Sequence, residues 1–282
     1  MDKAATTQTT KSIQNNAPDN FSARPVPFRG GGFQPKPIRG VAPFVFIGLI
    51  AFWEFGSQTG FISSLVLPAP SEAFQAFREL IESGMLLIHL SASMQRLLIG
   101  WICGTTLGII VGLMIGLSSI ARAGLSPLVS AIFPIPKIAL LPLFIIWFGI
   151  GEGSKVATIL FGTFFPTVIT TYGGVDNVDR NLIRMGQSFG LSWSSIVKKI
   201  IFPGALPAIL SGCRISGSIA IILLVAAEMI GAEFGIGAYI LLAGSLFATD
   251  QLIAGVAILS TMGLCFAWLI GRAEKYFLNW RT

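Results

Sequence analysis

Four ionisable residues lie inside long apolar stretches of this sequence, where charge is unfavourable. They are Glu54, Lys137, Arg214 and Glu228. A charge at the middle of a lipid bilayer costs about 2.5 to 3.5 kcal/mol on insertion scales, so charged residues at that depth pair with one another or face water. A cation there can attract an anion, and an acid beside a base can join two helices. These four residues are therefore the first candidates for a functional role.

Lys137 occurs in the run FPIPKIALLP, in which Pro134, Pro136 and Pro142 interrupt regular helical hydrogen bonding. Freed backbone groups are tolerated at membrane depth only where they are buried in protein or lie beside water. Lys137 can therefore face a polar path through the membrane and attract an anion. A lysine near a helix end can equally extend its charged group to the membrane surface, and that alternative stays open.

The other three charges have structural alternatives. Arg214 can meet the inner membrane surface or the loop before its span. Glu228 fits a buried ion pair or a gate contact as well as a polar path, and its negative charge opposes direct binding of an anion. Glu54 lies between two aromatic residues and is expected to make a helix-packing contact.

Small hydroxylated residues in the same stretches are candidates for lining a path. Serine and threonine commonly bond a preceding carbonyl or a neighbouring helix in membranes, so packing is the alternative for each of them. The hydroxylated residues considered are Thr163, Thr167, Thr170, Thr171, Ser216 and Ser218; the path is predicted to include Lys137, Thr167, Ser216, Ser218 and Glu228.

The sequence offers little for catalysis or metal binding. Its single histidine, His89, is placed outside the predicted spans, and Cys103, Cys213 and Cys265 lie far apart in apolar segments without metal-ligand spacing. It contains no G-x4-G-K-[ST] loop to hold phosphates. We predict no catalytic residue, no metal and no cofactor. A membrane enzyme is disfavoured because it would need acids, histidines or metal ligands that converge.

Composition indicates the elements that must position these residues. Apolar residues make up 53% of the 282 positions and charged residues 11%, too few to cover a globule in water. A membrane span needs about 20 apolar residues. We therefore predict an all-α, polytopic membrane protein with about six spanning helices. The apolar stretches run approximately over residues 41–61, 97–117, 125–150, 156–172, 205–230 and 252–270.

The distribution of lysine and arginine predicts the orientation. Residues 1–40 are polar, carry six basic residues and lack the apolar core of a cleaved signal, so we expect a disordered basic tail before a membrane domain at 41–282. Basic residues also gather between the fourth and fifth spans and at the C-terminus, whereas acidic residues predominate on the opposite side. By the positive-inside rule both termini are cytoplasmic.

One connection on the outer side contains an amphipathic helix. It follows Pro68 and Pro70, and Ser71 is predicted to cap its N-terminus. We expect this helix to lie on the outer surface. Its apolar face comprises Phe74, Phe77, Leu80 and Ile81.

Small residues recur in GTTLGIIVGLMIG from Gly104. Such spacing lets helices approach closely and predicts a packing face. Whether that face joins two copies of the chain is left open.

The longest cytoplasmic connection, about residues 176–207, contains two short helical patterns. Gly190 permits the turn between them, Ser192 can cap the second helix, and Pro203 is expected to end it. Apolar residues alternate here with basic ones, which predicts a docking surface. The apolar set is Ile183, Met185, Phe189, Leu191, Ile196, Val197 and Ile200, and the basic set is Arg180, Arg184, Lys198 and Lys199.

Gly190, Ile200 and Pro203 have the spacing G-x9-I-x-L-P, so this connection resembles the coupling loop of permease subunits in bacterial ATP-binding-cassette importers. Arg184, Met185 and Gly186 replace the Glu-Ala-Ala of that motif, and Phe202 replaces its leucine. The resemblance continues through LPAPSEAF, PIPKIALLPLFIIWFGIGEGSK, FPTVITTYGGVDNVDRNLIRM and LLVAAEMIGAEFGIG. Together these runs resemble the nitrate, sulfonate and taurine permease family, most closely its aliphatic sulfonate and taurine members.

The resemblance implies a type I importer permease fold in the bacterial inner membrane. It also implies cytoplasmic ATPase subunits, a second permease copy forming a homodimer, and a periplasmic or lipid-anchored substrate-binding protein. This chain would move a small anion by alternating access without hydrolysing ATP, and no nucleic-acid partner is expected. The resemblance assigns ATPase coupling to Arg184, Met185, Gly186, Phe189, Gly190, Leu191, Ile200 and Pro203.

Three alternatives remain. The substrate can instead be nitrate or bicarbonate, or a thiamine precursor or aromatic acid of the kind that related systems handle. A secondary transporter working alone can also have six spans, although it would need no docking surface on its inner loop.

Overall fold

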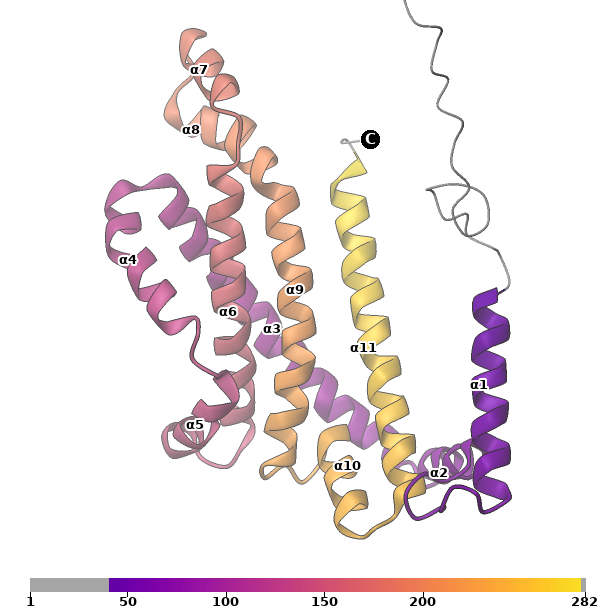
Figure 1. Cartoon of the computed structure of the whole chain (residues 1–282). Helices are drawn as coiled ribbons and strands as arrows, with labels where there is room; N and C mark the ends of the chain where they lie inside the picture. Colours follow the sequence, from indigo (N-terminus) through magenta and orange to yellow (C-terminus); the bar gives the residue numbers. More distant parts are fainter. Residues whose placement is uncertain (1–40, 280–282) are drawn as a thin grey trace, which may run out of the picture. The chain divides into compact units, whose positions relative to one another are not determined.

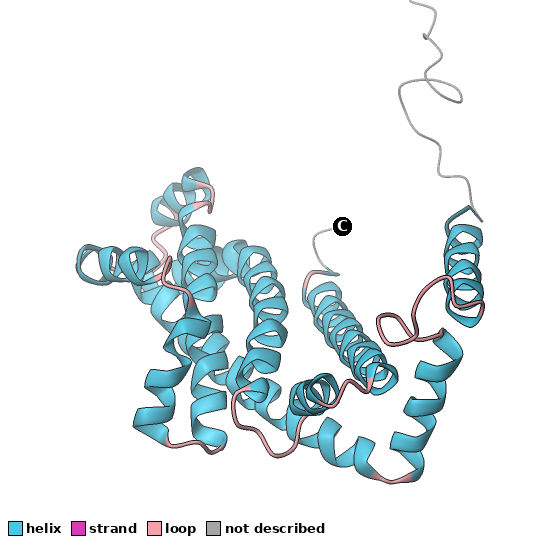
Figure 2. Ribbon diagram, turned by 60° about the horizontal axis from the view of Figure 1, so that its bottom comes forward, coloured by secondary structure: helices cyan, strands magenta, loops and turns pink. Residues whose placement is uncertain are grey.

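The structure of the protein, a computed structural model, describes residues 41–279. Within that range it contains helices and no strand (Figure 2). The chain divides into two units, with the boundary between Ala51 and Phe52. Helix α1 (Val41–Gln58) runs from the first unit into the second. The predicted basic tail, residues 1–40, lies outside the described residues.

The second unit contains the helices that follow α1 (Figure 1). Two of them are not α-helices: η1 is a 3₁₀ helix and η2 is a π-helix. In chain order they are α2 (Pro70–Glu82), α3 (Met85–Leu117), α4 (Ser119–Ile132), η1 (Lys137–Leu140), α5 (Leu141–Phe148), α6 (Glu152–Asp176), α7 (Arg180–Ser188), α8 (Trp193–Ile196), η2 (Val197–Ile201), α9 (Phe202–Met229), α10 (Ile236–Ser245) and α11 (Thr249–Phe277).

Four helices of the described chain are long and apolar enough to cross a membrane: α3, α6, α11 and the run Trp193–Met229 that ends with α9. A fifth candidate is the pair α4 and η1–α5, which bends by 92°. The predicted third span, residues 125–150, falls on this bent pair, and Pro134 and Pro136 lie in the break between its helices. Helix α1 adds 18 mainly apolar residues, slightly fewer than the roughly 20 that a membrane span needs.

Helix α3 begins at Met85, well before the predicted start of the second span at Leu97. His89, which was placed outside the predicted spans, and Arg96 therefore both lie in α3, where they are buried. Their polar groups are satisfied by residues from distant parts of the chain, so they tolerate burial.

Helix α6 is central to the second unit and packs against α3 on one side and α9 on another. The α3 contact explains the repeated small residues. A Cβ on Gly104 would lie 2.1 Å from Thr163 Oγ1 and 2.6 Å from the Leu160 carbonyl oxygen. The predicted packing face is thus used within one chain. Its glycines are Gly100, Gly104, Gly108, Gly112 and Gly116, which meet Ile159, Thr163, Thr167, Thr171 and Val175 respectively.

The predicted amphipathic helix corresponds to α2, but its N-cap is Ala69 rather than Ser71. Ser71 lies in the first turn, where its backbone N–H and hydroxyl both donate to the Glu54 carboxylate, at 3.0 and 2.6 Å. Glu54 therefore makes the expected packing contact and joins the end of α1 to the start of α2. The Trp53 indole N–H, which donates to the Pro68 carbonyl at 3.0 Å, reinforces this junction.

Candidate functional site

Helices α7 and α8 form the predicted helix–turn–helix at one end of the second unit (Figure 1). Gly190 lies in the turn with φ +68°, a conformation that side chains with a Cβ rarely adopt. The Leu191 N–H closes the turn by donating to the Gly186 carbonyl at 3.1 Å. Ser192 caps α8 by accepting from the Ser195 N–H at 3.4 Å. The predicted turn and cap are confirmed.

The helix pair has one packed side and one exposed side. Gly186 and Ile196 are buried, and a Cβ on Gly186 would lie 2.9 Å from the Cδ1 atom of Ile200. The exposed apolar residues Met185, Phe189 and Trp193 leave 51%, 79% and 66% of their surface open. Such an apolar ridge is typical of an interaction site. Exposed basic residues accompany the ridge: Arg180, Arg184, Lys198 and Lys199.

Pro203 does not end the second helix as predicted. The π-helical turn η2 carries the chain from α8 into α9, and Pro203 lies in the first turn of α9. Because η2 leads directly into α9, Pro203 lies within a continuous helix, just after a π-helical turn where regular α-helical hydrogen bonding is already interrupted. The run Trp193–Met229 is therefore continuous, and the predicted docking loop, residues 176–207, connects directly to a candidate spanning helix.

A buried ion cluster lies at the other end, where α3, α6 and α9 approach one another. Arg96 Nη1 donates to Glu228 Oε1 at 2.8 Å, and its Nε and Nη2 donate to the two Glu152 oxygens at 2.5 and 2.7 Å. The Arg96 and Glu228 side chains are 5% and 0% exposed, whereas that of Glu152 is 65% exposed. One guanidinium thus holds three helices together.

The cluster also holds the N-terminus of α10, a helix that the sequence did not predict. The Gly237 N–H donates to Glu228 Oε2 and the Ile236 N–H to Ser93 Oγ, both at 2.8 Å. Ser93 Oγ in turn donates to the Glu228 carboxylate at 2.7 Å. A Cβ on Gly235 would lie 2.5 Å from the Glu228 carboxyl carbon, so the close approach requires glycine.

The predicted path residues comprise two charged side chains, which are described here, and three hydroxylated ones. Glu228 is saturated by the ion cluster, and Lys137 Nζ donates to the carbonyls of Ile132, Phe133 and Ile135 at 3.1, 2.7 and 2.7 Å. These carbonyls are among the groups freed at the break after α4. Lys137 also lies 5.0 Å from the centre of the Phe165 ring, so its charge is stabilised within the chain.

The three hydroxylated path residues are not equivalent. Thr167 is buried and donates to the Thr163 carbonyl at 2.8 Å. Ser216 is buried, donates to the Cys213 carbonyl at 2.9 Å and accepts from the Trp101 indole at 3.2 Å. Ser218 is exposed on α9. Their positions favour packing for Thr167 and Ser216, and leave Ser218 open to a path.

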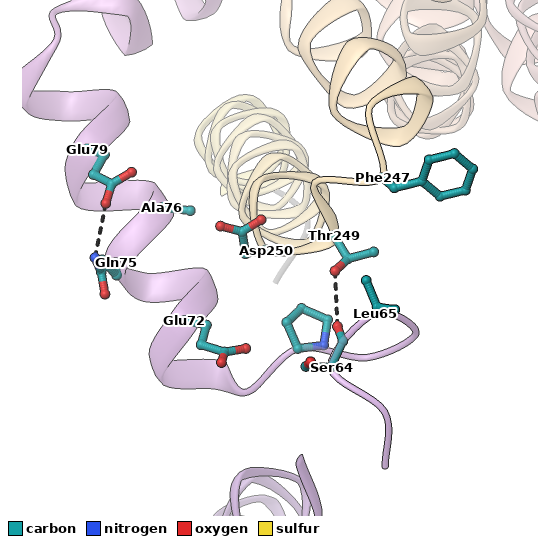
Figure 3. A pocket seen from close by; sticks show the side chains of 10 residues that line it. Ser64, Leu65, Glu72, Gln75, Ala76, Glu79, Phe247, Thr249 and Asp250 are labelled. Carbon is teal, nitrogen blue, oxygen red and sulfur yellow. Dashed lines mark hydrogen bonds between the residues drawn. The ribbon is translucent and has the colours of Figure 1, made fainter. Parts of the chain in front are cut away.

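An acidic pocket of about 390 Å³ lies between α2, the loop before it and the turn from α10 to α11 (Figure 3). Glu72, Glu79 and Asp250 line it. The Thr249 hydroxyl donates to the Ser64 carbonyl at 3.1 Å and holds the turn beside the loop. Among residues 41–279, no three His, Cys, Asp or Glu side chains lie close enough together to hold a metal ion.

Comparison with known proteins identifies the family. Residues 104–277 match the family described as binding-protein-dependent transport system inner membrane component. The chain is 36% identical to the aliphatic sulfonates transport permease protein SsuC of Bacillus subtilis (strain 168), over 83% of this chain and 85% of that protein. It is also 36% identical to the taurine transport system permease protein TauC of Escherichia coli (strain K12), over 82% and 86%.

Two further matches have lower sequence identity. The formylaminopyrimidine transport permease protein ThiX of Halalkalibacterium halodurans is 30% identical over 84% of this chain and 94% of its own length. An inward-facing structure of the MetNI methionine ABC transporter matches with a TM-score of 0.59 at 18% identity, covering 68% of this chain and 96% of that chain. The chain therefore belongs to the binding-protein-dependent inner-membrane transport family, as the permease subunit of an ATP-binding-cassette importer that works with ATPase subunits, a substrate-binding protein and a second permease.

Proposed function

We propose that this permease moves a small organic sulfonate or taurine into the cytoplasm by alternating access. Two relatives that are 36% identical over most of the chain are named for aliphatic sulfonates and taurine, which supports this substrate class. The protein would perform no chemistry on the anion. Its spanning helices would alternate between two packed arrangements that ATP binding in the partner subunits favours in turn.

The observation that carries the proposal is the exposed ridge of Met185, Phe189 and Trp193, which we assign to ATPase docking. Gly186 and Ile200 would support the ridge from inside, the exposed Leu191 would extend it, and Gly190 would set its angle. Arg184, exposed at its edge, would interact with acidic groups on the ATPase. Pro203 would contribute by starting the spanning helix α9, so that movement of the ridge also moves α9.

We further propose the arrangement of the assembly in the membrane. The loop at about 176–207 and both termini would be cytoplasmic, with residues 41–282 forming the membrane domain and residues 1–40 a disordered tail. Two copies of this chain would form a homodimer. A periplasmic or lipid-anchored binding protein would deliver the substrate at the end that carries α2 and the acidic pocket.

A test of the docking assignment is co-purification from the native membrane with a tagged chain. The unaltered chain should bring an ATPase subunit with it, and Met185→Glu or Phe189→Glu should reduce the recovered ATPase at least severalfold, because each places a charge in an apolar interface. Gln187→Glu is the matched control, since Gln187 is exposed on another face of α7. A chain that purifies alone and still transports would contradict the proposal and indicate a secondary transporter.

A thiamine precursor is the second candidate substrate, and the 30% identity to the formylaminopyrimidine permease ThiX favours it. The nitrate and bicarbonate alternative rests on the sequence resemblance alone. Competition in an uptake assay separates these possibilities. Unlabelled ethanesulfonate should inhibit taurine uptake, whereas a neutral pyrimidine should not.

A further inference from the structure

Helix α9 has a polar strip that the rest of the described chain leaves uncovered. Ser211, Arg214 and Ser218 are exposed, and their spacing of three and four residues places them on one helix face. The Arg214 side chain is 61% exposed. On the same helix, Ser216 and Glu228 are buried. The polar strip, defined as Ser211, Arg214 and Ser218, is therefore not part of the packed interior of this chain.

The polar strip lies toward the cytoplasmic end of the predicted fifth span, where Arg214 is level with Glu274 of α11. The continuous helix runs over Trp193–Met229, which exceeds the length of about 20 residues that a bilayer core requires. Counted back from Met229, such a span reaches roughly residue 210, so the strip lies in its half nearer the docking loop. A charge at that position faces water or a protein partner, because contact with hydrocarbon is unfavourable.

Arg214 has fewer polar partners than other cations of the spanning helices. Arg96 is saturated by Glu152 and Glu228, and Lys137 donates to three carbonyls. Lys155 is 4% exposed and donates to the carbonyls of Ile150 and Gly151 at 3.3 and 3.2 Å.

By contrast, Arg214 forms an ion pair with Glu274 of α11 at 3.5 Å, with most of its side chain open. Because only Nη1 of Arg214 is paired with Glu274 and most of the side chain is exposed, the guanidinium retains donors for a further anion.

We propose that Arg214, assisted by the hydroxyls of Ser211 and Ser218, forms an anion-binding position in the inner half of the translocation path. The choice of a sulfonate as the anion rests on the proposed function. A guanidinium can donate two parallel hydrogen bonds to sulfonate oxygens as it does to a carboxylate or phosphate. Glu274 would compete for the same cation and keep the anion weakly bound, as passage requires.

The test measures the access of charged thiol reagents to the polar strip. Ser218→Cys is placed in a chain whose Cys103, Cys213 and Cys265 are replaced by alanine, in native membranes. The probes are an anionic sulfonatoethyl methanethiosulfonate and its cationic trimethylammonioethyl counterpart, both of which form a disulfide with the thiol. We expect the anionic probe to react, and Arg214→Gln to lower the ratio of anionic to cationic rates by about tenfold or more, since a charge in a cleft concentrates counter-ions.

Three further variants separate anion binding from a structural role. Arg214→Lys should keep most of the preference for the anionic probe. Glu274→Gln should raise it, because the competing carboxylate is gone, whereas a merely structural Arg214–Glu274 pair would make this variant resemble Arg214→Gln. Arg272→Gln, which removes a cation that lies over the Trp268 ring on α11, is the charge control and should leave the ratio unchanged.

A cysteine at position 218 that neither probe reaches would overturn the proposal. So would a rate ratio that Arg214→Gln does not change. The assay requires neither an ATPase partner nor substrate uptake, so its failure is distinguishable from failure of the proposed function, which co-purification and uptake test.

Discussion

Arg96 organises the end of the second unit away from the docking loop. It contacts Glu152 at the start of α6 and Glu228 near the end of α9, and its Nη1 also donates to the Phe234 carbonyl at 2.6 Å. The N–H groups at the start of α10 add partial positive charge beside Glu228. Glu228 thus has partners for both of its oxygens, and its geometry favours a structural joint over a contact with an anionic substrate.

Breaking this buried pair should destabilise the protein. Arg96→Gln or Glu228→Gln should each reduce stability by about 3 to 5 kcal/mol, because an uncompensated charge stays buried. Thermal unfolding of the purified chain in detergent measures the change as a lower Tm. Glu152→Gln is the matched control and should lower Tm much less, since water screens its exposed carboxylate. An equal decrease in Tm for all three variants would contradict the explanation that the loss of stability comes from leaving a buried charge unpaired.

Sequence reasoning missed this cluster although a signal was present. His89, Ser93 and Arg96 are spaced by four and three residues, which places them on one face of a helix. The predicted second span began at residue 97, directly after these three residues. Their partners Glu152 and Gly235 are too distant in sequence for local patterns to connect. The isolated charges Glu228 and Lys137 were found because each interrupts an apolar stretch.

At the scale of elements, the contact between α3 and α6 depends on glycines that face threonines and branched side chains. Gly112 illustrates the closeness, because a Cβ there would lie 2.5 Å from the Thr171 Cβ and 2.8 Å from the Val168 carbonyl oxygen. Small residues allow such backbone approach in membranes, where burial away from water supplies no driving force between helices. The Thr171 hydroxyl lacks a partner within the described chain.

Replacing a glycine in the contact between α3 and α6 should test how closely the two helices pack. Gly104→Ala would force α3 away from the α6 backbone and should destabilise the protein by about 1 to 3 kcal/mol. Gly124→Ala is the control, because Gly124 lies within α4 and a Cβ there meets nothing within 4 Å. Chemical unfolding of the two variants in detergent gives the comparison. A Gly104→Ala variant as stable as Gly124→Ala would show that the helices are not in close contact.

The joint between α7 and α8 sets the angle of the docking ridge. Gly190→Ala should weaken ATPase association, since a left-handed conformation costs about 1 to 2 kcal/mol for a residue with a Cβ. Gly190→Asn should retain more association, because asparagine tolerates this conformation better. Affinity of the ATPase for the detergent-solubilised permease is the measurement. Equal affinities for both variants would argue against a role for the turn.

Much of the element order could be predicted from the sequence, because long apolar stretches, Gly190 and Ser192 are local signals. Pro134 and Pro136 predicted an interruption of the helix, but the 92° bend was not predicted because the apolar stretch continues through them. The short helix α10 was also missed. Its N-terminus is fixed by Ser93 and Glu228, so it depends on tertiary contacts that periodicity does not report.

At the scale of the whole molecule, the second unit combines a docking ridge at one end with an ion-paired end that carries the acidic pocket. The continuous helix Trp193–Met229 extends from the docking loop to Glu228. The polar strip lies on that same helix. Movement of the loop on ATP binding would therefore reach both the anion-binding position and the ion cluster through one rigid element.

The most direct test of this account is uptake by vesicles that contain the permease with its ATPase, supplied with the binding protein and labelled taurine. We predict uptake that requires hydrolysable ATP, is inhibited by unlabelled ethanesulfonate, and falls at least tenfold in Met185→Glu but not in Gln187→Glu, because only the former charges the docking ridge. Uptake that proceeds without ATP and follows an imposed ion gradient would contradict the account.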